Sequence, residues 1–189
     1  MIKLGIGFKM NKAIFLDRDG TINIDEGYVH KIEDLEFIPN VTEGLRRLQK
    51  EYQLIIVSNQ TGIGRGYYTE EDYFAFRNEM HKRLKEQGIL ITAEYFCPHH
   101  PEKGIGKYRV YCNCRKPKIG MLEQAAQDFN LNLNECWMIG DNVSDIDAGK
   151  NANCRTIHVL TGEKKEPIVY ADFVAKDLIE AANYILNNL

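Results

Sequence analysis

Residues 13–21 read AIFLDRDGT, an apolar run that ends at two carboxylates, Asp17 and Asp19. Side chains alternate along an extended chain, so both carboxylates should lean to one side of a strand end while Arg18 points away. Two like charges this close favour a divalent cation that could also meet a phosphate. A strand that simply ends in a polar turn is the alternative, so the rest of the chain must decide between the two.

The composition bounds the class of protein. The chain has 189 residues, 44% of them hydrophobic, which suits a single domain over 1–189 with a sizeable core. A net charge of −3 gives no bulk attraction to nucleic acid or to an anionic membrane. No window is long and apolar enough for a membrane span, so we expect a cytoplasmic protein, a monomer, with no nucleic-acid or membrane partner. Residues 1–9 could be an N-terminal extension if Met10 is the natural start.

Apolar runs alternate with helical patterns along the chain, which predicts an α/β fold with a parallel sheet covered on both faces. Asn40 with Glu43, and Thr69 with Asp72, have the spacing of helix N-terminal caps. The glycines of residues 62–66 predict a mobile loop. The expected strands are 12–17, 54–57, 92–96, 136–140 and 155–160, and the expected helices are 40–50, 69–87, 119–129, 144–152 and 176–189.

Three later stretches carry polar groups where strands or helices should begin or end. Ser58 and Asn59 follow an apolar run and could donate to a phosphate, although a polar strand end explains them equally well. Residues 115–118 read RKPK and offer a cation at the start of a helix, or a solvated basic patch. Residues 140–145 read GDNVSD, in which Asp141 could join the metal site, and the alternative is a helix cap formed by Asp145 or Asn142.

Taken in order, the motifs D-x-D-G-T, S-N, R-K-P-K and G-D-x-x-x-D resemble the four signatures of the haloacid dehalogenase superfamily. The resemblance implies the three-layer, Rossmann-like parallel sheet of that fold. It also implies that Asp17 is the nucleophile that forms an aspartyl-phosphate, and that Asp19 is the general acid and base. Ser58 and Lys116 would stabilise the transferring phosphoryl group. Mg²⁺ would be held by Asp17, the backbone carbonyl of Asp19, and Asp141.

A second metal site is suggested by three cysteines and a histidine, namely Cys97, His99, Cys112 and Cys114. A Cys₃His set suits tetrahedral Zn²⁺, and four protein ligands leave no position for substrate, so this zinc should be structural. His99 is preferred to His100. The alternatives are a disulfide and free buried thiols, of which the second fits Cys136 and Cys154.

The spacing of the motifs leaves no room for a separate cap domain, because the gap before Ser58 fits one loop and one helix, and the zinc-binding insertion spans only residues 97–114. The stretches DRDGTIN, GYVH, NQTGIGRG, CPHHP and CNCRKP closely resemble the heptose 1,7-bisphosphate phosphatases within the superfamily. That resemblance implies a sugar phosphate substrate and heptose biosynthesis for lipopolysaccharide or another glycan. Its implied substrate contacts are Asp25, Glu26, Gly27, Tyr28, Ser58, Asn59, Gln60, Thr61, Arg115, Lys116 and Asn142.

Within that set, Arg115 would hold the distal phosphate, and Asn142 departs from the lysine that relatives often carry. Three other readings stay open. One is a histidinol-phosphate phosphatase, whose zinc loop is similar but shorter. Another is a phosphoryl-accepting receiver-like module, which gathers carboxylates around Mg²⁺ in the same way. The last is a zinc-loop binding protein without catalysis, although every catalytic position is intact.

Overall fold

A computed structural model describes residues 11–162 and 164–189. Six parallel strands form one sheet in the order β3-β2-β1-β4-β5-β6. The order reverses between β1 and β4, and parallel sheets bind their ligands at the carboxyl ends of the strands beside such a reversal. The strands are β1 (Ala13–Leu16), β2 (Gln53–Asn59), β3 (Ala93–Cys97), β4 (Trp137–Gly140), β5 (Arg155–Val159) and β6 (Phe173–Ala175).

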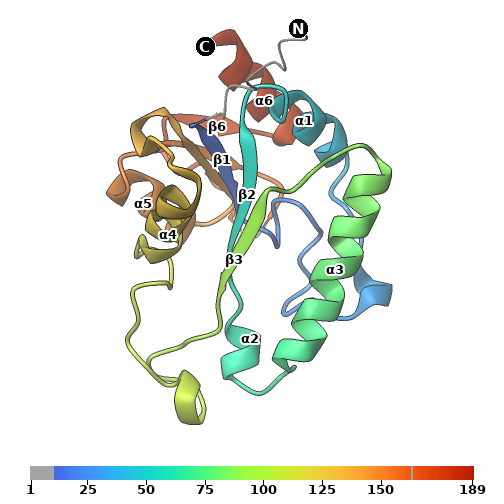
Figure 1. The fold of residues 1–189 in the computed structure, drawn as a ribbon, viewed down its shortest axis with the longest axis vertical. Helices are drawn as coiled ribbons and strands as arrows, with labels where there is room; N and C mark the ends of the chain where they lie inside the picture. The colour runs from blue at the N-terminus through green and yellow to red at the C-terminus, as the bar shows by residue number, and fades with distance from the viewer. Residues whose placement is uncertain (1–10, 163) are drawn as a thin grey trace, which may run out of the picture.

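Helices cover both faces of the sheet, as Figure 1 shows. On one face lie α1 (Val41–Leu48), α3 (Glu70–Glu86) and α6 (Leu178–Asn187), and on the other lie α4 (Gly120–Phe129) and α5 (Val143–Asn151). Strand alternation explains the two cores, because Ile14 and Leu16 of β1 pack into one of them while Ala13 and Phe15 pack into the other. The predicted three-layer α/β sheet is therefore confirmed.

The connections between strands are short, as the motif spacing predicts. Between β1 and β2 lie a 3₁₀ turn (Ile32–Asp34) and α1, and between β2 and β3 lie the short helix α2 (Thr61–Gly64) and α3. Residues 97–114, which we call the cysteine loop, contain only one 3₁₀ turn, Gly106–Tyr108. In the described chain, neither the β1–β2 connection nor the cysteine loop holds a cap domain. No separate domain within the described ranges therefore covers the carboxyl ends of the strands.

Helix α3 is formed as the sequence predicts. The Thr69 hydroxyl accepts a hydrogen bond from the backbone N–H of Asp72 at 3.1 Å, and the Asp72 carboxylate accepts one from the backbone N–H of Thr69 at 2.8 Å. This reciprocal pair satisfies two backbone donors at the start of the helix. Phe76, Met80 and Leu84 are fully buried along its inner face. The predicted helix and its predicted core face are both confirmed.

Two expectations about local structure are wrong, and one strand was not predicted. Asn40 makes no capping bond, since its φ of 68° is left-handed, and Glu43 instead pairs with Arg46 and Arg47 at 2.6 and 2.9 Å. The stretch 62–66, expected to be a loop, begins inside helix α2. Strand β6 was not anticipated, because three residues carry too little pattern to predict a strand.

None of the helices in the described ranges is both long enough and apolar enough to cross a membrane. The extension proposed for residues 1–9 lies outside the described residues.

Thr69→Ala should lower the free energy of unfolding by about 1 kcal/mol, because it removes the acceptor for the Asp72 N–H at the start of α3. The measurement is urea denaturation followed by circular dichroism. Asn40→Gly is the matched control, since Asn40 makes no capping bond and glycine tolerates its positive φ. Equal losses in the two variants would contradict a stabilising cap at Thr69.

Candidate active site

A cavity of ≈ 970 Å³ opens at the carboxyl ends of the strands, beside the reversal of the strand order between β1 and β4. Nearly every residue predicted for the catalytic, substrate and magnesium sites lines it. The exception is Glu26, whose side chain is exposed outside the cavity. The predicted residues in the lining are Asp17, Asp19, Asp25, Gly27, Tyr28, Ser58, Asn59, Gln60, Thr61, Arg115, Lys116, Asp141 and Asn142.

Lys116 is the central cation of this cavity. Its side chain is 1% exposed, and its ammonium lies 2.9 Å from Asp17 Oδ1 and 2.6 Å from Asp145 Oδ1. It also donates to the carbonyl of Val57 at 2.7 Å. Although burial acts to lower it, the carboxylates of Asp145 and Asp17 raise the pKa of Lys116 above its ordinary value. Lys116 therefore remains charged in a position from which it can also reach a phosphate on Asp17.

Asp17 lies directly after β1, in a buried position where its negative charge is unfavourable. Burial raises its pKa well above the ordinary value, and the carboxylates of Asp145 and Asp141 raise it further against the opposing effect of Lys116. Carboxylate oxygens of Asp17, Asp141 and Asp145 lie within 4.8 Å of one another. Hard divalent cations prefer oxygen ligands in such a cluster, so these residues fit Mg²⁺. Both carboxylate oxygens of Asp145 are engaged, Oδ1 by Lys116 and Oδ2 by the backbone N–H of Asn142, so Asp145 is the least suited of the three to bind the metal.

Asp19 is held by four nitrogen donors. The Arg18 guanidinium approaches it with Nη2 at 2.8 Å from each oxygen and Nε at 3.0 Å from Oδ1, while Gln60 donates at 2.8 Å and Asn23 at 3.0 Å. Arg18 is buried, with its guanidinium 4.7 Å from the centre of the Phe76 ring. The expectation that Arg18 points away from the carboxylates is wrong, because a buried guanidinium needs an anion and its long side chain turns back to find one.

The two residues of the S-N motif, Ser58 and Asn59, make different contacts. The Ser58 hydroxyl lines the cavity and accepts a hydrogen bond from Gln60 at 2.7 Å. The Asn59 side chain instead holds the backbone of Lys116, accepting from its N–H at 3.0 Å and donating to its carbonyl at 3.1 Å. Asn59 thus positions Lys116, a role that differs from the phosphate contact expected from its sequence motif.

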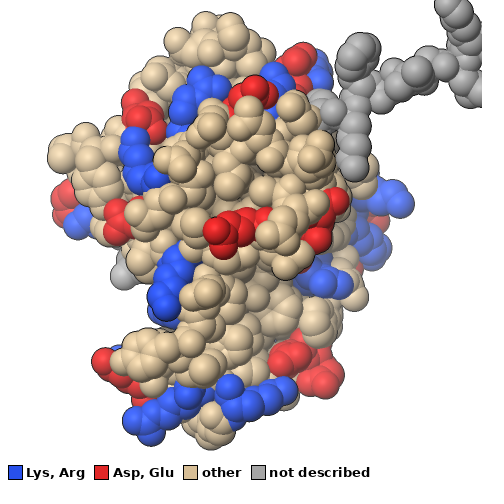
Figure 2. Space-filling model, turned by 60° about the vertical axis from the view of Figure 1, so that its left-hand side comes forward, with Lys and Arg blue, Asp and Glu red and all other residues tan. Residues whose placement is uncertain are grey.

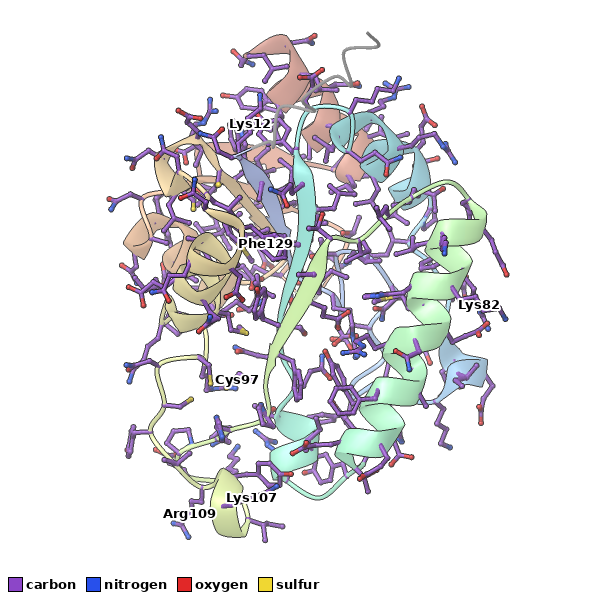
Figure 3. The ribbon with its side chains drawn as sticks, in the orientation of Figure 1. Lys12, Lys82, Cys97, Lys107, Arg109 and Phe129 are labelled. Carbon is purple, nitrogen blue, oxygen red and sulfur yellow. The ribbon has the colours of Figure 1, made fainter. Side chains whose placement is uncertain are left out.

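The four residues of the predicted zinc site come together at the end of β3, where Figure 3 labels Cys97. The Cys97 sulfur lies 3.6 Å from that of Cys112 and 3.1 Å from that of Cys114, and His99 Nδ1 lies 3.3 Å from the Cys114 sulfur. Ligands about 2.3 Å from a tetrahedral zinc are separated by roughly 3.8 Å, so these spacings fit a four-coordinate ion after a small expansion.

The alternatives for the cysteines are also answered by the structure. All five cysteines are free thiols, so the disulfide reading is not supported, and Cys136 and Cys154 are buried in the core as expected. Hydrogen bonding, first of all from Cys97, lowers the pKa of Cys114 to about 5, so a thiolate forms readily in the cluster. His100 does not join the cluster, and its Nδ1 accepts from the backbone of Glu102 and Lys103.

Basic side chains gather at the tip of the cysteine loop. Lys103, Lys107 and Arg109 are exposed there, and Figure 2 shows blue side chains along the lower end of the molecule. Figure 3 labels Lys107 and Arg109 at this lower edge, away from the sheet. None of the three lines the cavity, so the cations available to a bound anion come from elsewhere.

Comparison with known proteins agrees with this geometry. Residues 113–181 match the family model described as HAD-hydrolase-like. The chain is 43% identical over 179 residues to the D-glycero-beta-D-manno-heptose-1,7-bisphosphate 7-phosphatase of Haemophilus ducreyi, covering 92% of this chain and 98% of the relative. The chain belongs to the haloacid dehalogenase-like phosphatases.

Two further relatives refine this assignment. The D-glycero-alpha-D-manno-heptose-1,7-bisphosphate 7-phosphatase of Campylobacter jejuni is 45% identical over 174 residues, covering 92% of this chain and 95% of its own. The crystal structure of a D,D-heptose 1,7-bisphosphate phosphatase from B. bronchiseptica, complexed with magnesium and phosphate, superposes with a TM-score of 0.82 at 28% identity, covering 94% and 99% of the two chains. The receiver-like and non-catalytic readings are therefore not supported for this phosphatase.

Several lining residues of this phosphatase were not predicted from the sequence. Thr161, Gly162 and Lys165 come from the loop after β5, and Ser144 lies in the first turn of α5. Asp145 was seen only as a possible helix cap, and it does serve the cap, accepting from the Asn142 N–H at 3.1 Å. Its second role, the ion pair with Lys116, could have been suspected from one feature of the sequence, because Asp145 is the final aspartate of the G-D-x-x-x-D motif.

Asp145→Asn should lower kcat by about 10- to 100-fold, the range for losing an outer partner that orients a functional group. The amide cannot balance the buried charge of Lys116, so the ammonium would shift toward Asp17. Turnover of a generic phosphomonoester measures the effect.

Asp147→Asn is the matched control, because Asp147 lies two residues further along α5 and bonds Tyr170 at 2.9 Å outside the cavity. A fully active Asp145→Asn enzyme would contradict the positioning role.

Proposed function

We propose that this phosphatase is a Mg²⁺-dependent phosphomonoester hydrolase that removes the 7-phosphate of D-glycero-D-manno-heptose 1,7-bisphosphate through an aspartyl-phosphate. The observation that carries the proposal is the buried ammonium of Lys116 held between Asp17 and Asp145 at the open end of the sheet. Relatives named for this reaction support the substrate.

In the first step a carboxylate oxygen of Asp17 attacks the phosphorus of the 7-phosphate. The bond between phosphorus and the sugar O7 breaks, and Asp19 gives its proton to O7 so that the alcohol can leave. Lys116 and the Ser58 hydroxyl balance the charge that spreads over the transferring phosphoryl oxygens. Lys116 is suited to this because it is already fixed by Asn59 and needs no reorganisation.

In the second step water attacks the phosphorus of the aspartyl-phosphate. Asp19 accepts the proton of that water, the bond from phosphorus to Asp17 breaks, and inorganic phosphate leaves. Asp19 thereby regains the proton that it gave to O7 in the first step. The donors from Arg18, Asn23 and Gln60 hold its carboxyl group in one place for both proton transfers.

Mg²⁺ is proposed to bind Asp17, Asp141 and the backbone carbonyl of Asp19. When bound, it would neutralise phosphate charge and the mutual repulsion of the carboxylates. The carboxylate cluster around Asp17 and Asp141 supports this ligand set.

Zinc in the cysteine loop is proposed to be structural. The loop is too short to have its own hydrophobic core, and Arg115 and Lys116 follow Cys114 directly in the chain. An ordered cysteine loop would therefore fix the backbone position of Arg115 and Lys116. The same loop is the reason that histidinol phosphate is the second candidate substrate.

The substrate side of the proposal depends on Arg115, which lines the cavity one residue before Lys116. Adjacent side chains diverge, so Arg115 can hold the distal phosphate while Lys116 serves the reacting one. The planar guanidinium can bind two phosphate oxygens at once. The cavity of ≈ 970 Å³ has room for a sugar with a phosphate at each end.

Asp17→Asn should keep the fold and lose turnover, because an amide cannot attack phosphorus, and Asp19→Asn should lower kcat by ~10²–10⁴-fold. The assay is phosphate release from heptose 1,7-bisphosphate, fructose 1,6-bisphosphate and histidinol phosphate, with and without Mg²⁺. Appreciable activity of Asp17→Asn would refute the mechanism. If kcat/KM is highest for histidinol phosphate, then histidinol phosphate and not the heptose bisphosphate is the substrate.

Cys112→Ser should lower the bound zinc from about one ion per chain and reduce kcat without changing a catalytic group. Native mass spectrometry and metal analysis give the stoichiometry. His100→Ala is the matched control, because His100 neighbours His99 but lies outside the cluster, and it should retain zinc. Equal zinc loss in both variants would contradict the proposed ligand set.

A further inference from the structure

Three basic side chains line the cavity among the described residues, namely Arg115, Lys116 and Lys165. Lys116 is committed to Asp17 and Asp145. An anionic group of the substrate that lies away from the reacting centre therefore has two cations to meet. One is Arg115, and the other is Lys165, which was not among the residues predicted for the site.

These two cations lie on opposite sides of the nucleophile. Arg115 is anchored beyond β3, where its Nη1 lies 3.5 Å from the carbonyl of His99. Lys165 is anchored beyond β5, where its ammonium lies 3.5 and 3.1 Å from the carbonyls of Leu160 and Thr161. In the sheet order β1, which carries Asp17, lies between β3 and β5. A phosphate that binds Arg115 therefore lies on one flank of the cavity, and a phosphate that binds Lys165 lies on the other.

The loop that carries Lys165 is built tightly against the reacting centre. The Thr161 hydroxyl donates to the carbonyl of Gly20 at 2.7 Å. A Cβ added at Gly162 would overlap the carboxylate of Asp141, and one added at Gly20 would lie 2.8 Å from the Gly162 Cα. The start of this loop is thus packed against Asp141, and Lys165, three residues after Gly162, lines the same cavity.

Lys165 differs from its neighbour Lys164 in what it contacts. Lys164 pairs with Glu166 at 3.4 Å and does not line the cavity. Among the described residues the Lys165 ammonium contacts two neutral carbonyl oxygens, at 3.5 and 3.1 Å. A phosphate would replace them with a charge-assisted hydrogen bond, which is about twice as strong as a neutral one. Lys165 is therefore available to an anion and Lys164 is engaged elsewhere.

We propose that Lys165 is a specificity-determining residue that binds the non-reacting phosphate of the bisphosphate from the flank opposite Arg115, so that the two cations together set the preferred anomer. The α and β anomers carry the 1-phosphate on opposite faces of the sugar ring. With the 7-phosphate fixed at Asp17, they direct the 1-phosphate toward different flanks of the cavity. This inference rests on the proposed function.

The test compares kcat and KM for the α and β anomers of heptose 1,7-bisphosphate and for heptose 7-phosphate. Lys165→Ala should raise KM and lower kcat/KM for one anomer roughly 10- to 100-fold, the effect of losing a hydrogen bond to a charged group. Arg115→Ala should shift the ratio of the two anomers in the opposite direction. Both variants should leave the monophosphate nearly unchanged, and Lys165→Arg should restore most of the lost selectivity.

Lys164→Ala is the matched control, and it should change none of these values. An unchanged anomer ratio in Lys165→Ala, or an equal loss on both anomers and the monophosphate, would overturn the inference. If the wild-type enzyme hydrolyses neither anomer, the proposed function fails instead. Calorimetric binding of fructose 1,6-bisphosphate and fructose 6-phosphate to the Asp17→Asn protein then decides, since loss of Lys165 must weaken the bisphosphate alone.

Discussion

The buried ammonium of Lys116 is the interaction on which the rest of the site depends. A charge with 1% exposure is stable only because Asp17 and Asp145 lie within 2.9 and 2.6 Å of it. These partners come from β1 and α5, and the Val57 carbonyl that also accepts from Lys116 comes from β2. These two ion pairs and one hydrogen bond therefore tie the carboxyl ends of β1 and β2 to α5.

The same contacts of Lys116 explain how the cysteine loop can influence the proposed active site although none of its cysteines lines the cavity. Lys116 enters the site from the loop side, two residues after Cys114, and Asn59 grips its backbone from the end of β2. Loop and strand thus set the position of one cation from two directions. Disorder at either end would leave Asp145 and Asp17 as unpaired carboxylates, which is unfavourable in a buried position.

Much of the fold could be predicted because apolar runs that end in polar groups mark the buried parallel strands, as at Leu16 and Val57. Contacts made by long side chains could not. Alternation fixes the direction of the Cβ atom of Arg18 but not of its guanidinium, which returns to Asp19. Lys165 resembles any other exposed lysine until the loop after β5 is folded against Asp141. The order of charged residues along the sequence does not show which loops come together in the folded protein.

The close packing of Gly162 on Asp141 and of Gly20 on Gly162 has a consequence for how this enzyme can vary. A side chain at either glycine would intrude on the carboxylate next to the chemistry, so the backbone there tolerates almost no change. Three residues further on, Lys165 is exposed and lines the cavity. The loop is thus closely packed beside Asp141 and open to substitution at Lys165, the proposed contact to the distal phosphate. Substrate preference can diverge through single exchanges there while the hydrolytic centre stays intact.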